Sequence, residues 1–224
     1  MDLANSIAIW RRILAQPGEA AFAAEKDSPS ANLTTAVIWV VAAALINFIA
    51  QAITFLVFNP MEQFLEMYNQ FLIASGASQT VVDELMAQFT GDSFRNTLMF
   101  SLLLGIIFFP IFFLIGSGIL WGVARVLGGT GDYTQQTYLI STYYAPLTII
   151  NVLLNLLASI IPILGFFTLA VFFYQILLTF YAMRVAHQLT PGKTIVTLFT
   201  PFAAVFAVSC CCSFLFITSL AAMQ

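Results

Sequence analysis

Four stretches of this chain carry no charged residue and are long enough to cross a lipid bilayer. The hydrocarbon core of a bilayer is about 30 Å thick and an α-helix rises about 1.5 Å per residue, so one crossing takes about 20 apolar residues. The stretches are Leu33–Phe58, Asn96–Ala124, Gln135–Met183 and Thr194–Gln224. Only 8% of the 224 residues are charged, against roughly 25% in a soluble domain, so most of the surface must face lipid.

The third stretch is too long for a single crossing. As one helix it would run on the order of 70 Å, more than twice the thickness of the hydrocarbon core. The segment Ile161–Gly165 contains both a proline and a glycine, and we expect the chain to turn there. The third span is then about Tyr138–Ile160 and the fourth about Leu164–Met183. The sequence therefore predicts an all-α polytopic membrane protein, a bundle of five transmembrane helices.

The distribution of basic residues predicts the orientation of this bundle, because Lys and Arg are retained on the cytoplasmic side of short loops. Six of the seven basic residues fall on one side of the predicted spans, and only Arg95 falls on the other. The six are Arg11, Arg12, Lys26, Arg125, Arg184 and Lys193. We therefore expect the N-terminus in the cytoplasm and the C-terminus outside.

With this topology, residues 1–32 form a cytoplasmic amphipathic segment and residues 33–224 form the membrane domain. Residues 59–95 are an external segment with five acidic residues against one arginine, and their spacing predicts two amphipathic helices separated at Gly76. Cation binding is one interpretation of these acidic residues. Carboxylates on solvated helix faces usually only keep a helix soluble, however, so we expect no metal site.

The N-terminal segment carries apolar residues at helical spacing. These residues are Leu3, Ile7, Trp10 and Leu14. We expect Trp10, Arg11 and Arg12 to anchor the segment at the lipid headgroups, where tryptophan is favoured and arginine meets anionic lipid. The alternative is that the same stripe docks a cytoplasmic protein partner.

Polar side chains inside the predicted spans also recur at helical spacing, so each set lies on one face of its helix. The candidates are Asn47 and Gln51 in the first span, Asn151 and Asn155 in the third, and Gln175 in the fourth. One interpretation is interhelical hydrogen bonds, worth about 0.6 kcal/mol each, that only hold the helices together. The other is a polar site of a transporter, permease subunit or lipid-handling protein.

Gly118 and Gly122 have the four-residue spacing at which small residues let two helix backbones approach closely. We expect close helix packing there, and a homo-oligomer is one way to achieve it. Pro110, Pro146 and Pro201 fall inside predicted spans and should kink them.

The sequence gives no pattern typical of an enzyme. His187 is the only histidine, and we expect it to be a solvated residue of a short cytoplasmic loop. No second histidine or repeated cysteine spacing completes a metal site around it, and no pair of nucleophile and base is evident. We therefore expect a protein without enzymatic activity, cofactor or nucleic-acid partner.

Several short motifs resemble those of the Yip membrane proteins, a Ypt- and Rab-interacting family, in their short prokaryotic form. They are Trp10 with Pro17 and Phe22 before the first span, the run Trp121–Tyr133, and Tyr144-Ala145-Pro146 in the third span. The five spans and the cytoplasmic N-terminus are similar too, so the resemblance covers nearly the whole chain. It implies a multi-pass protein of the prokaryotic inner membrane.

The resemblance also implies a non-enzymatic membrane scaffold or adaptor, since eukaryotic members serve vesicle transport, contact Rab GTPases and shape membranes. This sequence departs from those members in its short N-terminal arm, which ends before Leu33, and in lacking their Asp-Leu-Tyr-Gly-Pro motif. A Rab-type GTPase is therefore a partner by resemblance alone. The other expected partners are the lipid bilayer and a membrane protein or a second copy of the chain.

Candidate recognition residues lie around the link between the second and third spans. They are Arg125, Gly128, Gly129, Asp132, Tyr144 and Pro146. Paired glycines let the chain leave one helix tightly and enter the next. Either this loop carries recognition, or it only makes a short turn between antiparallel helices.

Overall fold

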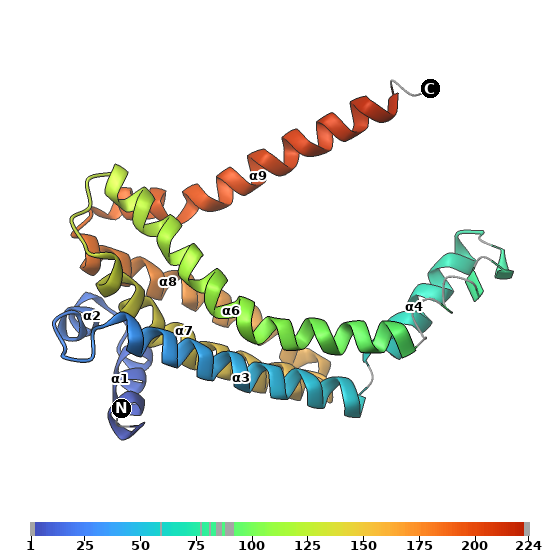
Figure 1. The fold of residues 1–224 in the computed structure, drawn as a ribbon, viewed down its shortest axis with the longest axis horizontal. Helices are drawn as coiled ribbons and strands as arrows, with labels where there is room; N and C mark the ends of the chain where they lie inside the picture. Colours follow the sequence, from blue (N-terminus) through green and yellow to red (C-terminus); the bar gives the residue numbers. More distant parts are fainter. Residues whose placement is uncertain are drawn as a thin grey trace. The chain divides into compact units, whose positions relative to one another are not determined.

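The computed structural model describes residues 3–58, 60–76, 78–80, 82–83, 87 and 92–221. Every regular element in these ranges is a helix (Figure 1). The helices are α1 Leu3–Ala15, α2 Glu19–Lys26, α3 Leu33–Phe58, α4 Pro60–Ala74, α6 Asp92–Val126, α7 Tyr133–Ala158, the 3-10 turn η1 Pro162–Gly165, α8 Phe166–His187 and α9 Pro191–Ala221. The predicted all-α class is confirmed.

Four of these helices are long and apolar enough to cross a membrane. The candidate spans are Leu33–Phe55, Met99–Val126, Tyr133–Ala158 and Pro162–His187. Large apolar side chains are exposed along them, such as Ile107 at 61% and Phe173 at 66%, as expected of surfaces that face lipid. A multi-pass integral membrane protein is therefore confirmed.

The fifth span and the orientation stay predictions. Helix α9 begins at Pro191, and its stretch Pro191–Ala207 is apolar but has fewer residues than a crossing needs.

The predicted turn inside the long third stretch is confirmed. Helix α7 ends at Ala158, and η1 begins with Pro162 before α8 starts at Phe166. A proline at the first position of a helix loses no hydrogen bond, because that N–H would have no partner inside the helix. The chain therefore reverses where its sequence combines a proline with a glycine.

Of the predicted external segment, the structure describes α4 and isolated residues after it. Gly76 follows the end of α4 with a φ of 88°, in the left-handed region that glycine adopts without strain. The second amphipathic helix predicted before residue 92 lies mostly outside the described residues.

The chain divides into two compact units by its internal contacts. The first unit comprises Met1–Val37, Phe113–Tyr144 and Phe173–Gln224, and the second comprises Ile38–Phe112 and Ala145–Phe172. The core of the first unit combines side chains of α1 and α2 with those of α7 and α8. Its largest buried apolar members include Ile13, Phe22, Tyr138, Leu139, Tyr143, Leu178 and Met183.

Candidate functional site

The link between α6 and α7, which we call the glycine loop (residues 127–132), starts as a tight helix end. Gly128 has a φ of 90°, and its N–H donates to the Arg125 carbonyl at 3.0 Å. The Gly129 N–H then donates to the Ala124 carbonyl at 2.8 Å, so two carbonyls at the end of α6 gain partners. At the other end of the loop, the Asp132 carboxylate accepts from the Thr134 N–H at 2.8 Å and caps α7.

The glycine loop packs against His187, the last residue of α8, and forms hydrogen bonds with it. The Gly131 N–H donates to Nδ1 of His187 at 3.2 Å, and the Thr130 N–H donates to the His187 carbonyl at 3.3 Å. Only 1% of His187 is exposed. The expectation of a solvated loop histidine was wrong, because the glycine loop folds over the ring and supplies it with a backbone donor.

The second ring nitrogen of His187 extends this contact into a buried chain of hydrogen bonds. Because Nδ1 accepts from Gly131, we assign the proton to Nε2, which lies 2.7 Å from the amide oxygen of Gln136. The Gln136 amide nitrogen donates to the Ser117 carbonyl at 2.8 Å, and Ser117 Oγ lies 2.7 Å from Thr137 Oγ1. Gln136, Ser117 and Thr137 are buried as well, so this network ties α6, α7 and α8 together.

Two glycines, Gly129 and Gly131, let the loop lie this close to the end of α8. A Cβ on Gly131 would lie 2.7 Å from the carbonyl carbon of Ala186, and a Cβ on Gly129 would lie 2.8 Å from Nδ1 of His187. Real Cβ atoms essentially never show such distances to these atoms. The pairing of loop and histidine therefore requires glycine at both positions.

Trp121 and Arg125, in the last turns of α6, also contact the glycine loop. The Trp121 indole N–H donates to the Gly131 carbonyl at 3.2 Å. The Arg125 guanidinium lies over that indole ring, 5.5 Å from its centroid, and donates to the Gly129 carbonyl at 3.4 Å. The buried side of the loop is thus fixed, while Arg125, Gly128, Thr130 and Asp132 are exposed.

The structure separates the six candidate recognition residues into groups. Arg125, Gly128, Gly129 and Asp132 lie on or beside the glycine loop. Tyr144 lies further along α7, where its ring is 5.0 Å from that of Phe113. Pro146 is buried inside α7 and belongs to the second unit.

The N-terminal arm, α1 and α2, packs against α7 and α8 through a buried carboxylate. Glu25 is 2% exposed, forms an ion pair with Arg12, and accepts a hydrogen bond of 3.1 Å from the Tyr138 hydroxyl. Phe22 is fully buried and meets the Tyr143 ring edge-on at 6.1 Å. The arm is therefore part of the first unit, with the Glu25 carboxylate turned toward the protein and Arg12 exposed.

Further contacts hold each helix of the arm to α8. The Tyr174 hydroxyl donates to the Leu14 carbonyl, and Arg184 forms an ion pair with Glu19. Of the three predicted lipid anchors, Trp10 is half-buried, Arg11 is exposed, and Arg12 is exposed and also paired with Glu25. Leu3 and Ile7 remain exposed, at 69% and 51%.

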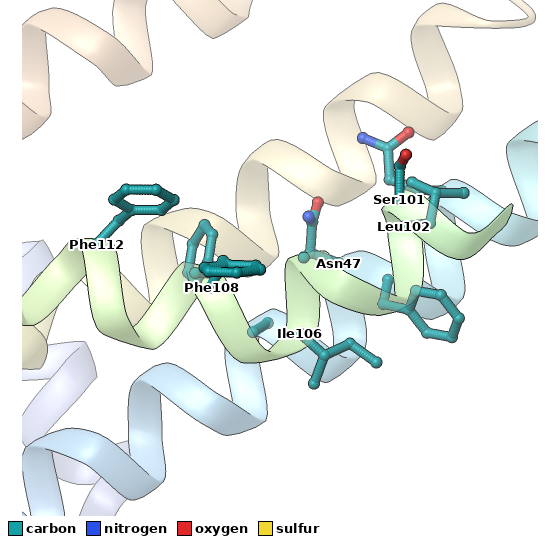
Figure 2. Close-up of a pocket in the computed structure, with 11 residues that line it drawn as sticks. Asn47, Ser101, Leu102, Ile106, Phe108 and Phe112 are labelled. Carbon is teal, nitrogen blue, oxygen red and sulfur yellow. The ribbon is translucent and has the colours of Figure 1, made fainter. Parts of the chain in front are cut away.

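Two of the predicted intramembrane polar residues line a pocket of about 260 Å³ between α3 and α6 (Figure 2). Asn47 is half-buried and Gln51 exposed, and the pocket includes the rings of Phe108 and Phe112 and the side chain of Ser101. Asn151 and Asn155 of α7 are not among the residues that line this pocket, and Gln175 belongs to the other unit. The Asn151 amide oxygen is buried without a hydrogen-bond partner among the described residues.

The two glycines expected to pack helices face different surroundings. A Cβ on Gly118 would lie 3.9 Å from the Tyr133 ring, an ordinary contact, and a Cβ on Gly122 would meet nothing within 4 Å. Within the described chain, the close approach occurs instead at Gly129 and Gly131 of the glycine loop.

Comparison with known proteins gives one match. The family model described as Yip1 domain matches residues 11–211, which include the arm from Arg11 onward, all four candidate spans and the glycine loop. No curated protein and no solved structure matches the chain.

Proposed function

Because this chain belongs to the Yip1 domain family, we propose that it is a non-enzymatic membrane scaffold or adaptor whose glycine loop presents the recognition surface. The scaffold would cross the prokaryotic inner membrane five times, with its N-terminus in the cytoplasm and its C-terminus outside. Its partner would be another membrane protein or a second copy of the chain. Contact with a Rab-type GTPase rests on the family alone.

The observation that carries this proposal is the way the glycine loop is held. Its inner side is fixed to His187 and Trp121, and its outer side offers exposed Arg125, Gly128, Thr130 and Asp132. A loop that is already ordered loses little conformational entropy when a partner binds, so it favours specific recognition. A turn that only reversed the chain would need neither the buried network nor the two close glycine contacts.

The proposed orientation is supported by the distribution of charge over the two units. The six basic residues predicted to be cytoplasmic all belong to the first unit, and Arg95 belongs to the second. The arm and the glycine loop belong to the first unit as well. The surface proposed for recognition therefore lies in the part of the chain that the basic residues assign to the cytoplasm.

Purification of the tagged full chain from membranes in a mild detergent tests this function. The proposal predicts a complex of defined mass, containing either two copies of the chain or one additional membrane protein in a fixed ratio. The variant Gly131→Ala should lose this complex while still inserting into the membrane, and Gly192→Ala should keep it. A strictly solitary monomer, or a complex unaffected by Gly131→Ala, would contradict the proposal.

A further inference from the structure

Two cations lie beside the glycine loop without a described acidic partner. Arg125 is exposed, and its guanidinium is positioned by the Trp121 ring and the Gly129 carbonyl. A Cβ on Gly128 would lie 3.6 Å from Nζ of Lys193, an exposed residue, so the Lys193 ammonium lies close to the same loop. The two positive groups, one from α6 and one from α9, therefore lie near neighbouring residues of the loop, Arg125 at Gly129 and Lys193 at Gly128.

Neither cation is neutralised within the described part of the chain. The ion pairs seen there join Arg12 to Glu25 and Arg184 to Glu19. The nearest acidic residue along the loop, Asp132, directs its carboxylate to the backbone N–H groups of Thr134 and Gln135. Most donors of Arg125 and Lys193 thus remain available to an external anion.

Helix stability does not explain the position of Lys193. An arginine in the last turn of α6 interacts favourably with the helix dipole, but a lysine in the first turn of α9 interacts unfavourably with it. Its charge is therefore unfavourable for α9 itself, and a bound anion would offset this.

The position of Trp121 and Arg125 at the end of a membrane span indicates the kind of anion that would bind there. Arg125 is next to the last residue of the span Met99–Val126, and Trp121 lies one turn earlier. Tryptophan followed by a basic residue at the end of a span is typical of the headgroup region of a bilayer. Tyr133 packs edge-on against Trp121 with ring centroids 6.3 Å apart, which extends the aromatic surface at this level.

We propose that Arg125 and Lys193 form a binding site for the phosphate headgroup of an anionic phospholipid. The planar guanidinium can donate two parallel hydrogen bonds to phosphate oxygens, and the lysine adds a second positive charge beside Gly128. This site goes beyond the proposed function, because it requires neither a protein partner nor a particular orientation of the chain.

Native mass spectrometry of the full chain in detergent, titrated with phosphatidylglycerol or phosphatidylcholine of the same acyl chains, tests the site. The wild type should bind phosphatidylglycerol more tightly than phosphatidylcholine. Lys193→Gln and Arg125→Gln should each weaken phosphatidylglycerol binding about fivefold, the effect expected for one cation near a headgroup, and leave phosphatidylcholine binding unchanged. Arg125→Lys, which keeps the charge and loses the planar fork, should fall between wild type and Arg125→Gln.

Arg95→Gln is the matched control, since it removes one positive charge near the opposite end of α6 and should leave lipid binding unchanged. Lys193→Gln alters only an exposed side chain, so it tests the site even if Arg125→Gln fails to fold. Unchanged phosphatidylglycerol binding in Lys193→Gln, or an equal loss in Arg95→Gln, would overturn the proposal. Displacement of the lipid by an excess of inorganic phosphate would also overturn it, because the site would then take a free anion.

Discussion

His187 shows how one buried polar side chain can position a loop and three helices. One ring nitrogen accepts a hydrogen bond from Gly131, and the other donates one to Gln136. Gln136 in turn donates to Ser117, whose hydroxyl is hydrogen-bonded to that of Thr137. A buried polar group without its partner costs about 1–3 kcal/mol, so each member of the network depends on the next. These contacts make the glycine loop an ordered surface.

The substitution Gly131→Ala should lower the stability of the protein by about 1–3 kcal/mol, the usual cost of overpacking. The added methyl group would meet the Ala186 carbonyl, which belongs to the backbone of α8 and cannot rotate away. Thermal unfolding in detergent measures the effect. Gly192→Ala is the matched control, because its methyl group would meet nothing within 4 Å, and equal melting temperatures for the two variants would count against the loop geometry.

The variants Gln136→Leu and His187→Leu should not have additive effects on stability. Gln136→Leu alone leaves Nε2 of His187 buried without an acceptor, and the second substitution removes that group. A double-mutant cycle, measured by denaturant unfolding in detergent micelles, should therefore give a coupling energy of about 1 kcal/mol or more. Additive effects would mean that the hydrogen bond contributes nothing specific.

The sequence could not reveal this network, although it contains one indication of it. Gln136 and Gly131 lie 51 and 56 residues before His187, and nothing local to Ala186-His187-Gln188 predicts burial. The run Gly128-Gly129-Thr130-Gly131 did predict a tight link between two spans. Its third glycine, unnecessary for a simple reversal, is the feature that indicates close contact with another backbone.

At the scale of elements, apolar length predicted the membrane helices well. Leu33–Phe58 is a single helix with the predicted bounds, and the reversal near Pro162 follows from proline and glycine chemistry. The arm was harder to predict, because its hydrophobic spacing fits a lipid surface and a protein surface equally well. Glu25 is the residue that distinguishes the two, since a buried carboxylate requires the partners that Arg12 and Tyr138 supply.

The variant Arg12→Ala should release the arm from α7 and α8. It leaves the buried Glu25 carboxylate with the Tyr138 hydroxyl as its described partner, and since the Arg12 end of the pair is exposed, the loss should cost about 1–3 kcal/mol. Hydrogen exchange of the α2 amides, followed by mass spectrometry, should become markedly faster. Glu19→Ala breaks the more exposed pair with Arg184 and should change exchange little; a reversed order of the two effects would contradict the docking we describe.

At the scale of the whole molecule, composition and the positive charges predict a topology that fusions to alkaline phosphatase, an enzyme active only outside the cytoplasm, can test. Fusions after Gly76 and at the C-terminus should be active, and fusions after Thr130 and Thr190 should be inactive. An inactive C-terminal fusion with the other three as expected would mean that α9 does not cross the membrane, and the protein would then have four spans.

The most direct test of the proposed scaffold is photo-crosslinking in intact membranes from a reactive residue at Thr130, on the exposed side of the glycine loop. The account predicts one defined adduct, either with a second copy of the chain or with a single membrane protein, and loss of that adduct in Gly131→Ala. The same reactive residue at Met67 of α4, which is 63% exposed, should not give this adduct. No adduct from Thr130, or the same adducts from Thr130 and Met67, would contradict the account.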